Sequence, residues 1–209
     1  MKKILLMAAV LLSSVGAFAQ NEVGSLTLQP KVGLNLANIT KFDNTETKLG
    51  LAAGAEFEYQ ATDLLSISAG VLYSKQGCDY KDMLVSGYGE KNMTTSLDYI
   101  NVPILANVYV VKGLAVKLGL QPSFLVGANN KSTTVLPVVG EKDATVDIKD
   151  NMNTFDLSLP VGVSYEYNNF VLDARYNMGL TKMFKDNSGF NTDAKNDVFQ
   201  FTLGYKFSL

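Results

Sequence analysis

The chain has 209 residues, of which 18 are Lys or Arg, 20 are Asp or Glu, one is Cys and none is His. Its formal charge of −2 lacks the basic surplus that a nucleic-acid-binding protein shows. The absence of His from the sequence excludes Ser-His-Asp and Cys-His catalysis, as well as any His-ligated metal site.

Residues 1–19 have the features of a secretory signal peptide. Lys2 and Lys3 are followed by an apolar stretch of 12 residues and by alanines at positions 17 and 19. That stretch is shorter than the roughly 20 residues that a membrane-spanning helix needs. We expect cleavage before Gln20, which leaves residues 20–209 as one domain. Without Lys2 and Lys3 this domain has 16 basic and 20 acidic residues, a formal charge of −4.

Eight segments alternate between apolar and polar residues, which is typical of strands with two unlike faces. They cover residues 26–36, 49–59, 65–75, 97–109, 114–127, 155–167, 170–180 and 199–209. In residues 170–180, Phe170 and Leu172 share one face, whereas Asp173 and Arg175 share the other. Strands of about 12 residues tilted by about 45° span roughly 28 Å, which matches the core of a bilayer.

The connections between these segments alternate in length. Those near 61–63, 111–113 and 168–169 are short, and those at 38–48, 76–96, 128–153 and 184–197 are long. Short turns on one side and long loops on the other are typical of outer-membrane barrels. We therefore predict an all-β fold, an eight-stranded antiparallel up-and-down transmembrane barrel, with both termini on the periplasmic side and the long loops outside the cell.

The polar face is predicted to line the lumen. It carries glycines at 33, 50, 54, 70, 119, 127, 162, 179 and 204, and a narrow eight-stranded lumen suits such small residues. The bulky apolar face then meets lipid; the alternative is a soluble barrel with an apolar interior. Aromatic residues near the short turns form a predicted girdle at the membrane interface: Tyr59, Tyr167, Phe170, Tyr205 and Phe207.

Several charged residues fall on the predicted lumen face. They are Lys31, Glu56, Glu58, Lys117, Asp156, Glu166, Asp173, Arg175 and Lys206. A charge in hydrocarbon is costly, whereas a charge inside a barrel can be paired. We predict an ion network that stiffens the barrel and largely plugs it. The alternative is that these charges line a selective passage.

Two further features concern proline and cysteine. Pro30, Pro103, Pro122 and Pro160 fall within predicted strands and each removes a ladder donor, so we expect β-bulges there and a possible one-residue slip of the faces beyond them. Cys78 cannot form an internal disulfide because it is the only cysteine. We interpret it as an idle loop thiol; pairing with another chain is the alternative.

Five short motifs occur in order along the mature chain: PKVGLNLANIT, GVLYSKQG, LDYINVPILANVYV, YEYNNFVLDARYNMGLTKMF and LGYKF. Together they resemble the PorT-like "porin family" outer-membrane barrels of Bacteroidetes-type bacteria. The chain departs from this pattern at Asn107, where a basic residue is expected, and at Leu209, where an aromatic residue is usual. The resemblance implies an eight-stranded barrel inserted into the outer membrane by the barrel-assembly machinery.

Our functional hypothesis is a non-enzymatic, monomeric outer-membrane barrel with a structural or interaction role. Its expected partners are outer-membrane lipid and an extracellular molecule bound by the four long loops, with no nucleic acid. A small-solute channel is one alternative, and a component of a secretion apparatus is another that the resemblance implies. An enzyme acting on lipid is disfavoured, because no P-loop, CxxC or catalytic spacing is present. We thus predict no catalytic, cofactor-binding or metal-ligating residues and no cofactor.

Overall fold

The fold is seen in a computed structural model, which describes residues 22–40, 45–84, 90–136, 140–185 and 193–209. The predicted signal peptide, residues 1–19, and its cleavage site lie outside the described residues. No helix in the described part of the chain is long and apolar enough to cross a membrane.

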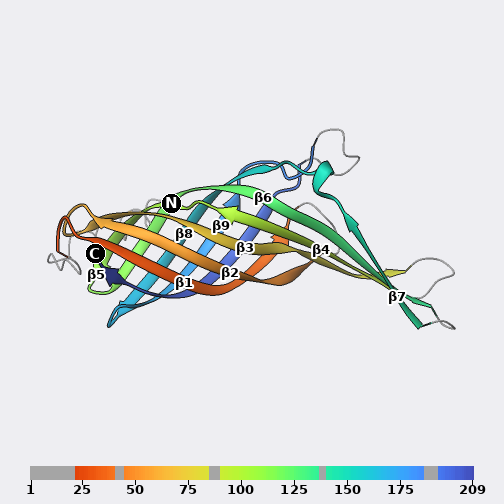
Figure 1. The fold of residues 1–209 in the computed structure, drawn as a ribbon, viewed down its shortest axis with the longest axis horizontal. Helices are drawn as coiled ribbons and strands as arrows, with labels where there is room; N and C mark the ends of the chain where they lie inside the picture. Colours follow the sequence, from red (N-terminus) through yellow and green to blue (C-terminus); the bar gives the residue numbers. More distant parts are fainter. Residues whose placement is uncertain (1–21, 41–44, 85–89, 137–139, 186–192) are drawn as a thin grey trace, which may run out of the picture.

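In the described residues, eleven strands form a single antiparallel sheet that closes on itself (Figure 1). The strands are β1 (Leu26–Ile39), β2 (Thr45–Gln60), β3 (Leu65–Leu84), β4 (Glu90–Asn101), β5 (Ile104–Val111), β6 (Leu114–Leu136), β7 (Gly140–Asp147), β8 (Phe155–Tyr167), β9 (Phe170–Gly179), β10 (Asn196–Tyr205) and β11 (Phe207–Ser208). A short 3₁₀ helix, η1, covers Lys149–Asn151.

Within the described ranges, the ring has eight wall strands. β5 continues the line of β4, β11 continues β10, and β7 pairs only with the outer part of β6. The ring closes because β1 pairs on one side with β2 and on the other with β10: Leu34 lies opposite Leu51 and opposite Phe201. The predicted eight-stranded antiparallel barrel is therefore confirmed.

The alternation of faces is also confirmed. Leu172 is 59% exposed on the outer surface, whereas Asp173, the next residue of β9, is fully buried inside the ring. Each wall strand repeats this arrangement, with large apolar side chains outside and mostly polar ones inside. The outer surface thus carries the apolar band that a bilayer requires, and the interior holds the groups that lipid would exclude.

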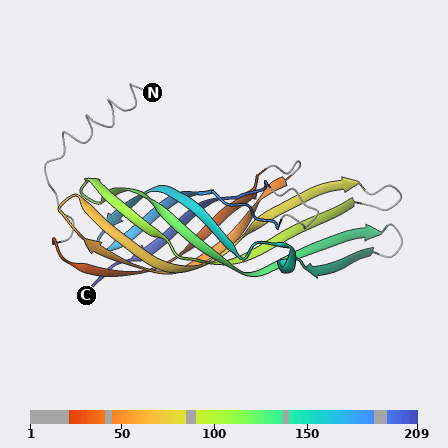
Figure 2. The same cartoon turned by 90° about the horizontal axis from the view of Figure 1, so that it is seen from above.

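The short connections lie at one end of the barrel, together with the C-terminus (Figure 2). Asn168 and Asn169 join β8 to β9 with φ values of 48° and 68°. Two successive residues in the left-handed region make the tight hairpin turn whose twist fits the flanking strands, and Asn tolerates that conformation better than most residues. The Leu209 amide donates to the carbonyl of Leu26 (3.0 Å), which holds the C-terminus against the first residue of β1.

At the opposite end, the predictions of long loops are partly wrong. Most of 76–96 is strand, because β3 runs to Leu84 and β4 starts at Glu90. Most of 128–153 is also strand, formed by the end of β6 and by β7. These two hairpins, yellow and green in Figure 2, extend beyond the rest of the wall. Residues 129–133 of β6, for example, are all polar, so no apolar alternation marks this extension in the sequence.

The expectation that the prolines mark bulges is wrong. Asn101 lies opposite Ser123 and Ile104 lies opposite Leu120, so β6 keeps its register across Pro103 and Pro122. Pro30 and Pro160 likewise interrupt pairing with one neighbour while pairing continues with the other. The missing N–H groups fall in short gaps of the ladder, and no register shift occurs at any of the four prolines. One shift between β4 and β6 lies at Asp98/Tyr99, and beyond it Ala128, not Gly127 as predicted, is the buried residue of β6.

Candidate functional site

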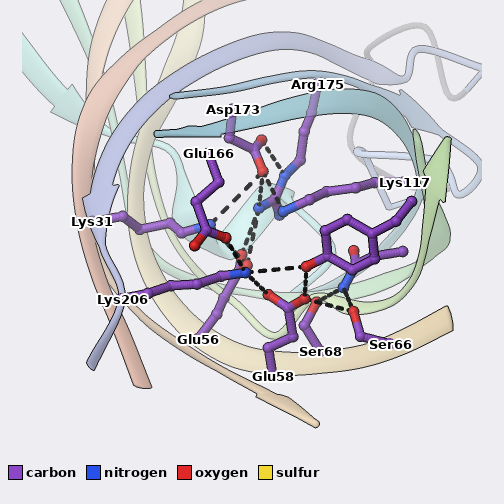
Figure 3. Close-up of polar contacts among 12 residues, drawn as sticks. Lys31, Glu56, Glu58, Ser66, Ser68, Lys117, Glu166, Asp173, Arg175 and Lys206 are labelled. Atoms are coloured by element: carbon purple, nitrogen blue, oxygen red, sulfur yellow. Dashed lines mark hydrogen bonds and ion pairs between the residues drawn. The ribbon is translucent and has the colours of Figure 1, made fainter. Parts of the chain in front are cut away.

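The candidate site is the lumen, where charged side chains from separate strands meet (Figure 3). Two groups of contacts can be distinguished. The Arg175 cluster consists of Lys31, Glu56, Lys117, Asp173 and Arg175. The Lys206 cluster consists of Lys206, Glu58, Glu166, Tyr109 and Ser66.

In the Arg175 cluster, two carboxylates share three cations. The ion pairs are Arg175–Asp173 (2.6 Å), Arg175–Glu56 (2.7 Å), Lys31–Glu56 (2.7 Å), Lys117–Asp173 (2.7 Å) and Lys31–Asp173 (3.9 Å). All five side chains are at most 3% exposed. Buried charges are tolerated only when they are paired and hydrogen-bonded, and here each cation reaches a carboxylate.

The Lys206 cluster joins opposite walls. The Lys206 ammonium contacts Glu166 (2.8 Å) and Glu58 (2.9 Å) and donates to the Tyr109 hydroxyl (3.1 Å). Tyr109 on β5 and Lys206, between β10 and β11, are separated by three wall strands in either direction round the ring. The Tyr109 hydroxyl donates in turn to Glu58, which also accepts a hydrogen bond from Ser66 on β3 (2.6 Å). The cluster therefore crosses the full width of the lumen.

Glycines give these long side chains their space. Gly162 on β8 lies directly opposite Lys117 on β6 and opposite Arg175 on β9. Lys31 on β1 is flanked in the same way by Gly54 on β2 and Gly204 on β10. A Cβ at Gly162 would lie 2.9 Å from the Arg175 Cγ and closer still to the Ala174 carbonyl. Gly70 on β3 lies opposite Glu56 on β2 as well, so four of the predicted lumen glycines, Gly54, Gly70, Gly162 and Gly204, lie beside the charged residues of the Arg175 cluster.

Eight of the nine predicted lumen charges lie in these two clusters. Asp156 does not join them: it is buried near the loop end of β8, and its carboxylate accepts a hydrogen bond from Thr181. No basic side chain among the described residues forms an ion pair with it. The sequence analysis did not include Tyr109 and Ser66. Both alternate with outward-facing residues of their strands, and this alternation would have assigned them to the lumen.

Toward the loop end, the lumen contents become apolar. The apolar cap is a cluster of buried residues made of Ile39, Cys78, Leu97, Tyr99, Leu125, Ala128, Met152, Met183, Phe184 and Ala194. Cys78 was interpreted as a loop thiol, and this is wrong, because it lies on β3 and is fully buried in the cap. The lumen therefore contains ion clusters on the side of the short turns and a hydrophobic cluster on the side of the hairpins.

The predicted girdle residues all face outward near the short turns. Tyr59, Tyr167, Phe170 and Phe207 are about half exposed or more. Tyr205 is partly covered, because its ring lies between those of Phe170 (centroids 5.0 Å apart) and Phe207 (4.8 Å). The rings of Phe170, Tyr205 and Phe207 thus form one continuous aromatic patch on the outer surface.

The sequence matches the family described as "Outer membrane protein beta-barrel domain" over residues 18–185. The chain belongs to this family. Its apolar outer surface and paired interior charges are thus features of an outer-membrane β-barrel domain. No curated protein matches the chain.

Solved structures of small outer-membrane barrels are similar to this chain. The attachment invasion locus protein Ail of Yersinia pestis aligns at 13% identity over 89% of this chain and 100% of its own, with a TM-score of 0.47. Neisserial surface protein A aligns at 17% identity over 87% and 97%, with a TM-score of 0.47. OprG of Pseudomonas aeruginosa aligns at 14% identity over 91% and 99%, with a TM-score of 0.41.

Proposed function

We propose that the chain is a non-enzymatic outer-membrane barrel with a closed lumen, whose projecting hairpins β3–β4 and β6–β7 contact a partner outside the cell. The contact between Tyr109 and Lys206 carries this proposal, because it joins opposite walls through the lumen. An eight-stranded barrel has an interior that side chains just fill. The two ion clusters and the apolar cap therefore close the lumen, so the barrel serves as a scaffold. The exposed hairpins are then the part of the protein that can bind a partner.

The non-enzymatic part of the proposal rests on the residue types present. The sequence has no His, and the buried carboxylates in the two clusters are each engaged by cations. A catalytic carboxylate must contact substrate, whereas these carboxylates contact the cations of their own clusters inside the lumen. We also propose export by the signal peptide 1–19 with cleavage before Gln20, insertion by the barrel-assembly machinery, and a monomeric state.

A small-solute channel is the second candidate, and unpartnered buried polar atoms favour it. Both side-chain polar atoms of Asn101, the Asn177 Oδ1 and the Arg175 Nη1 have no hydrogen-bond partner among the described residues. Buried polar atoms of this kind usually bind water. Water between the Arg175 cluster and the apolar cap would be one section of a path for solutes. A role in a secretion apparatus is supported only by the resemblance to PorT-like proteins.

Single-channel recording of the refolded mature protein in a planar bilayer tests the proposal. A correctly folded, inserted barrel that remains electrically silent is the expected result. Reproducible discrete conductance steps would instead favour the channel. In that case Glu58→Gln and Lys206→Met should change ion selectivity, because these side chains lie across the path. Folding is checked by the difference in gel migration between heated and unheated samples.

A further inference from the structure

The apolar outer surface of β8 and β9 ends abruptly at the side of the hairpins. Phe155, the first residue of β8, and Leu180, just beyond β9, are 47% and 40% exposed. The outward alternation of β9 continues from Leu180 to Lys182, whose side chain is 51% exposed. The boundary between the lipid-facing surface and the first charge is therefore sharp here.

A hollow of about 760 Å³ lies at this boundary. Phe155 and Leu180 form its apolar part, Asn153 and Thr154 contribute polar groups, and Lys182 and Lys185 are the charged residues of its lining. The hollow thus has two halves. The apolar half is continuous with the lipid-facing wall, and the basic half lies beyond the end of that apolar surface.

The backbone that carries the two lysines is held to the start of β8. The Asn153 Nδ2 donates to the carbonyls of Lys182 (2.9 Å) and Phe184 (3.2 Å), and the Lys185 amide donates to Asn151 (3.1 Å). The Lys185 ammonium donates to the Asp150 carbonyl (2.7 Å), which leaves further N–H groups for a ligand. Lys182 pairs with the exposed Asp193 at 3.4 Å, and an exposed pair of this kind is weak.

We propose that this hollow binds a phosphorylated lipid of the outer leaflet, with its phosphate at Lys182 and Lys185 and an acyl chain along Phe155 and Leu180. A phosphate monoester carries a charge of about −1.5 to −2 and three acceptor oxygens, which suit two ammonium groups. A free phosphate ion would leave the apolar half unused, whereas a lipid fills both halves. The site is independent of whether the lumen conducts ions.

The refolded protein in phosphatidylcholine nanodiscs containing phosphatidic acid tests this proposal. Native mass spectrometry measures how much phosphatidic acid the protein retains relative to phosphatidylcholine. Each of Lys182→Gln and Lys185→Gln should reduce the retention ratio roughly fivefold, as expected for a lysine close to an anionic membrane surface. Leu180→Asn should also reduce it, because the acyl chain loses its contact.

Lys131→Gln is the matched control. Lys131 is about as exposed as Lys182 (52%) and is also paired with one aspartate, Asp143, but it lies on the projecting part of β6, away from the hollow. Its replacement should leave retention unchanged. An equal loss in all three lysine variants would show non-specific attraction, and no loss in the Lys182→Gln/Lys185→Gln double variant would overturn the site. Displacement of phosphatidic acid by inorganic phosphate would show that the lysines bind free phosphate instead. Conductance of the same variants, recorded in a planar bilayer, keeps this test separate from that of the closed lumen.

Discussion

Arg175 on β9 forms an ion pair with Glu56 on β2, with Nη2 and Oε1 2.7 Å apart, although the two residues are 119 positions apart in the chain. β10 and β1 lie between their strands in the ring. The pair therefore connects parts of the wall that have no backbone contact with each other. Because both side chains are almost fully buried, removing either partner leaves the other charge without its ion pair and out of contact with bulk solvent.

Replacing Arg175 should destabilise the barrel strongly. Arg175→Ala leaves Glu56 and Asp173 with the two lysines alone, and breaking a buried pair of this kind costs about 3–5 kcal/mol. Lys131→Ala is the control, because the Lys131–Asp143 pair has a similar distance of 2.7 Å but is half exposed, and such pairs contribute about 0–1 kcal/mol. Urea unfolding in lipid vesicles measures both. Equal losses would show that the Arg175 cluster has no special role in stability.

Gly162 should not tolerate a side chain. A Cβ there would lie 2.4 Å from the Ala174 carbonyl oxygen and 2.9 Å from the Arg175 Cγ, so Gly162→Ala should cost about 1–3 kcal/mol through overpacking. Gly127→Ala is the control, because the nearest atom to its Cβ is the Asp98 carboxylate at 3.1 Å, which can rotate away. The same unfolding assay compares the two. A neutral Gly162→Ala would mean that the wall adjusts locally to make room.

The Tyr109 hydroxyl should stabilise the Lys206 cluster. Tyr109→Phe removes a group that donates to Glu58 and accepts from Lys206, and hydrogen bonds to charged groups contribute about 1.5–3 kcal/mol. The loss should be smaller than in Arg175→Ala, because the Lys206–Glu58 pair at 2.9 Å remains. Tyr165→Phe, on the half-exposed outer surface of β8, should be nearly neutral. A thermal melt by circular dichroism ranks the three variants, and a neutral Tyr109→Phe would contradict the role.

The membrane-spanning part of the fold was predictable because lipid and lumen impose opposite requirements on alternate residues. Asp173 and Arg175 could be assigned to the interior only because they alternate with apolar residues along the strand. Their partners could not be identified, because the contact of Arg175 with Glu56 depends on the register of every strand pair between them. Asp156 has the same parity but lies farther toward the loop end, where Thr181 meets it and the cations do not reach.

The hairpins and the apolar cap were not predictable by the same rule. Outside the membrane band the outer face of a strand need not be apolar, so Thr94, Thr95 and Ser96 show no alternation in the sequence, although they are part of β4 and Thr95 is buried. The apolar cap also departs from the pattern of polar residues inside and apolar residues outside, because Leu97 and Leu125 are apolar residues that face inward. Inward apolar residues are stable here because Met152 and Met183, which follow β7 and β9 in the chain, are buried in the same cluster.

Burial of Cys78 leads to the last prediction. The thiol is enclosed by the apolar cap, so a maleimide should not label the folded protein, whereas urea-unfolded protein should react at once. No disulfide-linked dimer should form on a non-reducing gel after oxidation. The control is Val146→Cys in a Cys78→Ala background, because Val146 on β7 is 60% exposed and its replacement should label fully in the folded state. Rapid labelling of Cys78 in protein that remains folded would show that the cap opens readily, and a cap that opens would leave only the two ion clusters to close the lumen.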